Sequence, residues 1–411
     1  MKRSAEWLSS REAAAHLGVK VETLYAYASR GLVKGQAGPR GQGRRYRRED
    51  LEPLRARGAG PAAQAMRFGD PVLDTRITRM TAHGPEYRGH LATALAAGGT
   101  PFEAVAELLW SGELPAVAPR WPADGPALPV RELSRLLPLG SPPLTALAVT
   151  LPVLAAADPL RFDTEPQSMI ARARQLIPRL AACCALVLDP GRVAAACDSG
   201  DPVRALALAL GVRPTPRALD LLRCALIVCA DHELNTSTFA ARVAASSGAN
   251  LYACLSAAVA AFSGPLHGGA SEHVEWLLRE AGSPAGAITA VAERMRRGEL
   301  LPGFGHTLYP GGDPRVPPLL QRAVALRPRA PRVRTLEALI DAMQRAHRPA
   351  PNVDVALAAV CAALELPIGM GPAIFAIGRC AGWVANILEQ QQVKLVLRPR
   401  ARFIGDAAPT G

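Results

Sequence analysis

The sequence predicts an all-α protein, and its composition and its apolar pattern are the two observations that support this fold class. Alanine and leucine dominate a chain that is 49% hydrophobic and 20% charged, which is typical of a globular protein with a large core. Only 5% of the 411 residues are aromatic. The core is therefore expected to consist of close-packed helices whose small side chains let the helix axes approach one another.

The first element is a compact module at residues 7–57. Ser9 and Glu12, three residues apart in WLSSREAAAHLGV, predict a capping box at the start of a short helix that ends at Gly18. A second helix, VETLYAYASRGLV, carries Leu24 on its inner side and ends at Gly31. Two short helices joined by a tight turn have the spacing of a helix-turn-helix.

The basic charge of the chain is concentrated in this module. Residues 1–60 hold 13 Lys and Arg against 6 Asp and Glu, within a net charge of +12 for the whole chain. A Gly/Pro-rich loop leads into RRYRR at 44–48, and the module resembles the amino-terminal DNA-binding domain of the MerR and excisionase-like families, a helix-turn-helix followed by a basic wing. The candidate DNA contacts are Lys20, Thr23, Tyr25, Arg44, Arg45, Arg47 and Arg48. The alternative is a solvated charged face on a small adaptor or dimerisation domain.

A linker and a second, larger region follow. Residues 58–66, GAGPAAQAM, are small and uncharged between Gly and Pro, which predicts a domain boundary. The segment LDTRITRMTAHGPEYRGHLATAL is too rich in Thr and Gly for a long helix, whereas FEAVAELLWS reads as a helix that stops at Gly112. Prolines then cut 115–160 into short helices and loops, and helical patterns resume at about 166–188, 191–210 and 216–232.

Eight cysteines lie mostly in apolar runs and none forms a C-x-x-C pair. This favours reduced thiols packed as small hydrophobes over disulfides or a metal site, and a cytoplasmic protein with no metal. Residues 243–271 lack Asp, Glu, Lys and Arg, but their Ser, Asn, Gly and His suit a buried core helix better than a membrane span. We expect no signal peptide and no membrane partner.

Between Ala230 and Arg315, four short polar strings interrupt the helical sequence: ADHELNTSTFAAR, GPLHGGAS, GFGHTLYP and GGDPR. They contain His232, His267 and His306, three of the eight histidines. Each histidine is flanked by Gly, Pro, Asp or Asn, the residues that end helices and bring side chains close to a ligand. The stretch predicts a pocket wall, although a lone histidine is more often structural, as expected for His273 and His347.

Together with PNVD at 351–354, IFAIGRCAGW and LRPR, these strings resemble the citrate synthase family in order and in separation. The resemblance extends more weakly to LDTRIT, EYRG and FEAVAELLWSGELP, so it covers essentially everything after the linker. It implies an all-α large domain at 67–266 and 355–411, a smaller helical domain at 267–354, and closure of the two over substrate.

The resemblance also implies a reaction. Family members join the methyl carbon of an acyl-CoA to the carbonyl carbon of oxaloacetate and then hydrolyse the thioester. By motif, Asp354 would be the general base, His267 would donate to the thioester oxygen as it becomes an enolate, and His306 would be the general acid toward the oxaloacetate carbonyl. His232 would hydrogen-bond oxaloacetate. No permanently bound cofactor is implied, and acetyl-CoA or another acyl-CoA is a co-substrate.

Three arginines match the carboxylate clamps of the family: Arg315, Arg379 and Arg398, the last reaching across from the other subunit of a homodimer with shared active sites. Guanidinium groups bind carboxylates bidentately, which lysine cannot do. Phe375 matches an aromatic near the substrate, with a core side chain as the equal alternative.

The sequence departs from the family after GFGH, where many members carry a basic residue near the coenzyme A phosphates. This chain has Thr307 and then Pro310, Gly311 and Gly312, so coenzyme A affinity would be reduced or another arginine would supply the charge. Propionyl-CoA, as in 2-methylcitrate synthase, remains open, because one methylene is worth only about 1 to 3 kcal/mol. A DNA-binding regulator whose synthase domain senses a metabolite is the alternative of a different class.

Overall fold

The structure, a computed structural model, describes residues 7–17, 21, 24–25, 28, 33, 35–37, 44–48, 51, 73–393 and 395–399. The chain divides into two compact units, Met1–Asp74 and Thr75–Gly411. The predicted linker at 58–66 lies outside the described residues.

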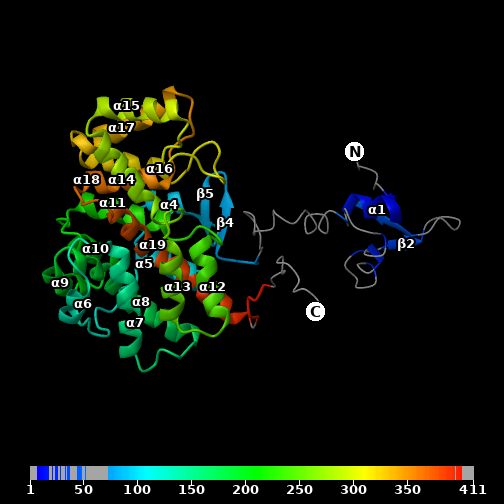
Figure 1. Cartoon of the computed structure of the whole chain (residues 1–411). Helices are drawn as coiled ribbons and strands as arrows, with labels where there is room; N and C mark the ends of the chain where they lie inside the picture. The colour runs from blue at the N-terminus through cyan, green and yellow to red at the C-terminus, as the bar shows by residue number, and fades with distance from the viewer. Residues whose placement is uncertain are drawn as a thin grey trace, which may run out of the picture. The chain divides into compact units, whose positions relative to one another are not determined.

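The smaller unit combines one described helix with an antiparallel sheet (Figure 1). Its elements are β1 (Trp7–Ser9), α1 (Ser10–Leu17), β2 (Gly35–Ala37) and β3 (Arg44–Arg47), with strand order β1-β3-β2. The predicted capping box is confirmed: the Ser9 backbone N–H donates to Glu12 Oε2 at 2.8 Å, and the Glu12 N–H donates to Ser9 Oγ at 3.3 Å. Tyr46 of β3 is fully buried and packs with Leu17 and Leu24 in a small core of its own.

The larger unit is built almost entirely of helices, and the all-α fold class is confirmed. Its first helices are α4 (Ala92–Ala97), α5 (Phe102–Ser111), α6 (Val130–Leu136), α7 (Pro143–Ala157), α8 (Pro166–Cys183), η2 (Cys184–Val187), η3 (Pro190–Arg192), α9 (Val193–Cys197), α10 (Pro202–Ala209) and α11 (Pro216–Cys229). The later ones are α12 (Thr236–Ser246), α13 (Leu251–Phe262), α14 (Ala270–Ala281), α15 (Pro284–Arg297), α16 (Val316–Leu326), α17 (Pro331–Arg345), α18 (Val353–Ala363) and α19 (Met370–Gln392).

Three features of this unit differ from the predicted elements. The Thr- and Gly-rich segment after the linker forms a small antiparallel sheet of β4 (Thr78–Thr81), β5 (Gly84–Tyr87) and β6 (His90–Leu91). The uncharged stretch 243–271 is not one helix, because Asn250 caps a new helix, α13, with its side chain. The pattern at 191–210 is broken into η3, α9 and α10, since Asp201 caps the last of these.

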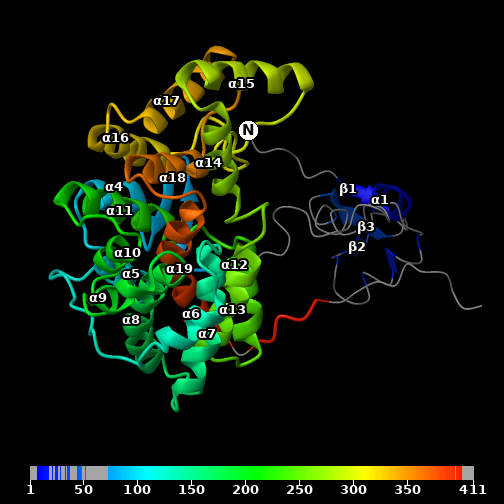
Figure 2. The same ribbon diagram turned by 60° about the vertical axis from the view of Figure 1, so that its left-hand side comes forward.

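Helix α19 is the central element of the unit (Figures 1 and 2). It packs against α5, α7, α8, α11, α12, α13, α14 and α18. It is long and apolar enough to cross a membrane by length and composition, but its apolar window is wholly buried inside the protein. In both views α14 to α18 gather at one end of the unit and α6 to α9 at the other. The predicted small domain at 267–354 falls largely in the first group, and its boundaries stay a prediction.

Two glycines let α19 approach α11. A Cβ on Gly378 would lie 2.7 Å from the carbonyl oxygen of Leu226, and one on Gly382 would overlap the carbonyl oxygen of Ala230. The Gly382 N–H donates to that Ala230 oxygen at 3.0 Å. Side chains larger than hydrogen would hold the two helices apart, so these glycines fix how close α19 comes to the end of α11.

The eight cysteines are unpaired and seven of them are buried. Burial raises the pKa of the Cys184 thiol to about 12, so the thiol stays protonated and behaves as an apolar side chain. Among the described residues, no group of three or more His, Cys, Asp or Glu side chains could hold a metal ion.

Candidate functional site

Six of the side chains singled out from the sequence come from five separate places in the larger unit. His232 follows the end of α11, His267 lies between α13 and α14, and His306 lies in the loop before α16. Asp354 is in the first turn of α18. Phe375 and Arg379 are one turn apart on α19.

The rings of His232 and His306 lie in contact. Their ring centroids are 5.4 Å apart, and Tyr309 packs on His306 at 4.7 Å. The Tyr309 hydroxyl also lies 3.3 Å from His232 Nε2. His306 Nδ1 accepts the backbone N–H of Leu308 at 3.1 Å. A neutral His306 therefore carries its proton on Nε2, which is left as a hydrogen-bond donor.

Arg315 and Asp313 form a buried pair beside these rings. Arg315 Nε and Nη2 donate to the two carboxylate oxygens of Asp313 at 2.9 and 2.7 Å. Asp313 also accepts the backbone N–H of Val353 at 3.0 Å, which fixes the start of α18 and so the position of Asp354. Burial alone would lower the pKa of Arg315, but the Asp313 carboxylate raises it above its ordinary value. Arg315 is thus a permanent buried cation.

His267 is held by a chain of polar contacts from α12 and α19. Its Nε2 lies 2.8 Å from the Ser237 hydroxyl, which accepts the indole N–H of Trp383 at 3.1 Å. The same hydroxyl donates to Asn235 Oδ1 at 2.7 Å when it does not donate to His267. Phe262 packs on the His267 ring at 4.9 Å. The ring orientation is therefore set from two sides.

Arg379 lies over the face of Phe375, 4.9 Å from the ring centroid. Its Nε donates to the carbonyl oxygen of Cys229 at 2.7 Å. Its Nη2 is buried and has no hydrogen-bond partner in the described part of the chain. An unsatisfied guanidinium donor is costly unless a ligand binds it.

Within the described ranges, Asp354 has an unpaired buried acceptor, as Arg379 has an unpaired buried donor. Its backbone N–H is capped by Asn352, and its Oδ1 is buried without a hydrogen-bond partner among the described residues. Burial raises the pKa of Asp354 to about 7, with Arg315 opposing the rise and Asp313 adding to it. A carboxylate with its pKa near neutrality is suited to take up and release a proton.

The pKa values of the three histidines are lowered, in contrast to the raised pKa of Asp354. Burial, with Arg379, lowers the pKa of His267 to about 4. Burial followed by Arg315, Arg379 and His306 lowers the pKa of His232 well below its usual value, and burial followed by Arg315 lowers the pKa of His306. All three rings are thus neutral near pH 7. One carboxyl with a raised pKa and three imidazoles with lowered pKa values thus lie around the Arg315 and Arg379 guanidinium groups. Groups whose pKa values are pushed apart in this way are suited to acid–base chemistry.

Comparison with known families identifies the family of the larger unit. The family described as "Citrate synthase, C-terminal domain" matches residues 68–400. The chain belongs to the citrate synthase family. The family resemblance of the polar strings is thus confirmed.

Individual relatives agree. A "Putative citrate synthase 2" of Mycobacterium tuberculosis is 41% identical over 199 residues, 47% of this chain and 53% of that relative, so the match spans about half the relative's length. A "2-methylcitrate synthase" of the same species is 30% identical over 78% of this chain and 84% of its own length. The solved citrate synthase of Thermoplasma acidophilum, in a ternary complex with carboxymethyl coenzyme A and oxaloacetate, has a TM-score of 0.72 and 26% identity, covering 83% of this chain and 95% of that one.

The smaller unit has a separate match. A family described as "Helix-turn-helix domain" covers residues 7–58. In the described part, Arg44 and Arg47 are exposed on β3 and Tyr25 is 48% exposed. Arg45 makes a hydrogen bond inside the unit, because its Nη2 donates to the Trp7 carbonyl at 2.9 Å. Lys20 and Thr23 lie outside the described residues.

The structure thus brings together His232, His267, His306, Arg315, Asp354, Phe375 and Arg379, but not Arg398. Arg398 is exposed in a segment after α19 whose Leu397 N–H donates to Ser246 Oγ at 3.0 Å. Sequence reasoning missed Tyr309, Asp313 and Ser237. All three lie inside the polar strings described above, and that position is the feature of the sequence that could have indicated them.

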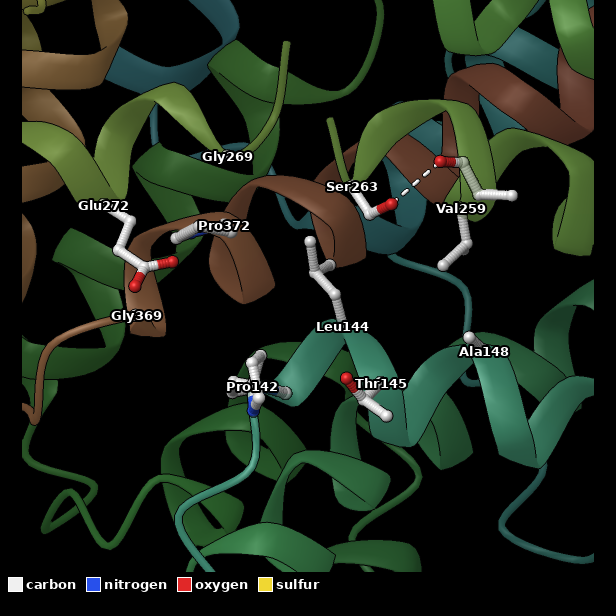
Figure 3. Close-up of a pocket in the computed structure, with 12 residues that line it drawn as sticks. Pro142, Leu144, Thr145, Ala148, Val259, Ser263, Gly269, Glu272, Gly369 and Pro372 are labelled. Carbon is white, nitrogen blue, oxygen red and sulfur yellow. Dashed lines mark hydrogen bonds between the residues drawn. The ribbon is translucent and has the colours of Figure 1, made fainter. Parts of the chain in front are cut away.

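A pocket of about 310 Å³ lies close to the His267 segment but is lined by different residues (Figure 3). Ser263 and Gly269, which bracket that segment, line it together with Leu144 of α7, Glu272 of α14 and Pro372 of α19. The lining includes no histidine and no arginine, so we assign the pocket no part in the chemistry.

Proposed function

We propose that this enzyme condenses acetyl-CoA with oxaloacetate to give citrate and free coenzyme A. The observation that carries the proposal is the buried Asp354 Oδ1, which has no hydrogen-bond partner among the residues that the structure describes, while neutral histidines and two buried arginines lie in the same site. A carboxylate base beside donors and cations is what the deprotonation of a thioester methyl group and the binding of a dicarboxylate require.

In the first step, ionised Asp354 takes a proton from the methyl group and the thioester oxygen gains the negative charge. His267 donates a hydrogen bond to that oxygen. It can donate from Nδ1 only when the Ser237 hydroxyl donates to Nε2, because a neutral imidazole carries one proton. The Ser237 hydroxyl accepts from Trp383 and has one proton, which it can donate either to Asn235 Oδ1 or to His267 Nε2. When it donates to His267, the proton of the imidazole is on Nδ1.

In the second step, the enolate carbon forms a bond to the keto carbon of oxaloacetate. The keto oxygen takes its proton from His306 Nε2, the donor left by the Leu308 contact. Arg315 and Arg379 bind the two carboxylates, and His232 donates to the same substrate. Water then adds to the thioester carbonyl carbon and the carbon–sulfur bond breaks. One proton of the water goes to the sulfur, so coenzyme A leaves as the thiol, and the other returns to His306 Nε2. Asp354 releases the methyl proton to solvent.

We further propose that the enzyme is a homodimer in which Arg398 serves the partner's site. In the segment around it, Val393, Leu395 and Val396 are 47%, 62% and 59% exposed. Three neighbouring apolar side chains left in water favour a protein contact. Arg398, on the same exposed segment, would then be carried into the second subunit.

Subunit mixing tests this arrangement. Asp354→Asn and Arg398→Ala variants should each be inactive alone. A mixed dimer would contain one intact site if Arg398 acts across the interface, so mixing should restore roughly a quarter of the wild-type activity. No recovery in mixed dimers shown to have formed would refute a shared site.

The acyl substrate is tested by thiol release with acetyl-CoA and propionyl-CoA under the same conditions. We expect kcat/KM for acetyl-CoA to exceed that for propionyl-CoA, with Asp354→Asn as the inactive control. The reverse order would favour 2-methylcitrate synthase. Absence of thiol release with both thioesters would remove the proposed reaction.

The second candidate function, DNA binding, rests on the helix-turn-helix match and on the exposed arginines of β3. Exposed cations on a strand next to a helix-turn-helix can neutralise phosphates. A gel-shift series with rising salt should show binding that weakens with salt and is reduced in an Arg44→Ala variant. Absence of any gel shift at low ionic strength would refute DNA binding by the β3 arginines.

A further inference from the structure

Asp231 is a fully buried carboxylate that the proposed mechanism does not use, although it adjoins His232 in sequence and interacts with Arg379. It immediately precedes His232 and is 0% exposed. The segment 229–231 runs along one face of α19: Arg379 Nε donates to the Cys229 oxygen, the Gly382 N–H to the Ala230 oxygen, and Asn386 Nδ2 to Asp231 Oδ1 at 3.3 Å. The three α19 residues are spaced three and four apart, so they share a face.

The other carboxylate oxygen of Asp231 shapes the turn that carries His232. It accepts the backbone N–H of Glu233 at 3.2 Å. Glu233 has φ of 56°, a left-handed conformation that is uncommon for a non-glycine residue. A side-chain acceptor two residues earlier is the usual way to stabilise such a turn.

The charge of Asp231 has a second consequence, because Arg379 has no ion-pair partner among the described residues. Arg315, in contrast, has both Nε and Nη2 occupied by Asp313. Asp231 and Arg379 interact electrostatically: burial raises the pKa of Asp231, and the Arg379 guanidinium opposes that rise. The Tyr87 hydroxyl also faces Asp231, and the Cys229 thiol faces Arg379. Both of these are neutral at pH 8, since burial raises the pKa of Tyr87 and also raises the pKa of Cys229 to about 12.

We infer that Asp231 is a positioning residue that acts as the remote counter-ion of Arg379. It balances the buried guanidinium from a distance, so Nη2 is not consumed by a protein carboxylate and stays available for a carboxylate of the substrate. The balance stabilises the ligand-free protein at the expense of anion affinity, because a negative charge near the clamp repels the incoming dianion. The inference rests on the proposed function for the identity of that anion.

Two neutral variants test the charge separately from the turn. Asp231→Asn keeps an oxygen acceptor for the Glu233 N–H, and Asp231→Ser provides a shorter one. Affinities for oxaloacetate and for inorganic sulfate are measured by calorimetry at pH 8, and thermal unfolding is followed with and without oxaloacetate. Asp158→Asn is the matched control, since Asp158 is a carboxylate with only 13% of its side chain exposed and a cationic partner, Arg172, away from the site.

We expect both Asp231 variants to unfold at a lower temperature without ligand and to bind both anions about 3- to 10-fold more tightly than the wild type. The Asp158→Asn control should lose stability with unchanged anion affinity. Unchanged or weaker anion binding in a folded Asp231→Asn protein would refute the counter-ion role. Asp231 would then only stabilise the turn at Glu233. Failure of both variants to fold even in saturating oxaloacetate would also refute it, because the dianion should replace the missing charge.

The two anions separate this inference from the proposed function. If the wild type binds sulfate but not oxaloacetate, the proposed substrate is wrong, and the comparison of sulfate affinities still decides the role of Asp231. If the wild type binds oxaloacetate and the neutral variants bind it no more tightly, the proposed function stands and the counter-ion role falls.

Discussion

Replacing Asp354 by Asn should abolish turnover and, at the same time, make the protein more stable above neutral pH. Turnover is lost because the amide cannot take the methyl proton. Stability is gained because the native state must bury a carboxylate whose Oδ1 has no hydrogen-bond partner in the described part of the chain. The pKa of that carboxyl is raised to about 7 by burial, against 3.8 for a solvated aspartate.

The sign follows from proton linkage. A group whose pKa is higher in the folded state holds its proton more tightly there, so its favourable contribution is complete below pH 4 and is lost as pH rises toward 7. With these two pKa values, the wild type loses about 2 to 3 kcal/mol between pH 5 and pH 8 through this group alone. The Asn variant carries no such group. Any fixed cost of burying the amide is the same at both pH values and cancels.

The assay is urea unfolding of wild type and Asp354→Asn at pH 5 and pH 8, with stability obtained by linear extrapolation. Relative to wild type, the variant should gain about 2 to 3 kcal/mol on going from pH 5 to pH 8. Glu365→Gln is the matched control, because its carboxylate is 62% exposed and should show little pH-dependent difference. Equal stability differences at both pH values, or residual turnover in the Asn variant, would refute the assignment of Asp354 as a buried base.

Three further predictions concern the same site. The turnover number should rise about tenfold from pH 6 to pH 8, as Asp354 with its pKa of about 7 ionises while the histidines, with lowered pKa values, stay neutral; a flat profile when chemistry limits the rate would contradict this. Ser237→Ala should lower kcat about 10- to 100-fold with little change in the KM for oxaloacetate, because His267 loses the contact that sets its tautomer; a loss confined to KM would contradict it. Gly382→Ala should destabilise the protein by about 3 kcal/mol or more, since the new methyl group would overlap the Ala230 oxygen, whereas Gly311→Ala, in open space, should not; equal stability losses in urea unfolding would show that α19 can move away.

The helical class, which is confirmed, and most residues of the candidate site could be predicted from the sequence because both depend on local sequence patterns. Helical spacing marks α5, and the polar strings place His232, His267 and His306 after helix ends, where backbone and side chain can reach a ligand. The β4–β5–β6 sheet was missed. Its strands are two to four residues long, with Gly and Pro inside β5, so period-2 alternation is too short to register.

What the sequence could not predict is how residues from distant segments share their hydrogen bonds and charges. The string GGDPR suggests a carboxylate clamp, but only the folded chain shows that Asp313 occupies Nε and Nη2 of Arg315 and also fixes the start of α18. Arg379 is the same residue type as Arg315, yet its Nη2 has no hydrogen-bond partner among the described residues. The difference arises because Asp313 is two residues from Arg315 in one loop, whereas Arg379 approaches the 229–231 segment only through the close α11–α19 crossing at Gly378 and Gly382. Of the two arginines, Arg379 therefore has the larger unfilled capacity for a substrate carboxylate.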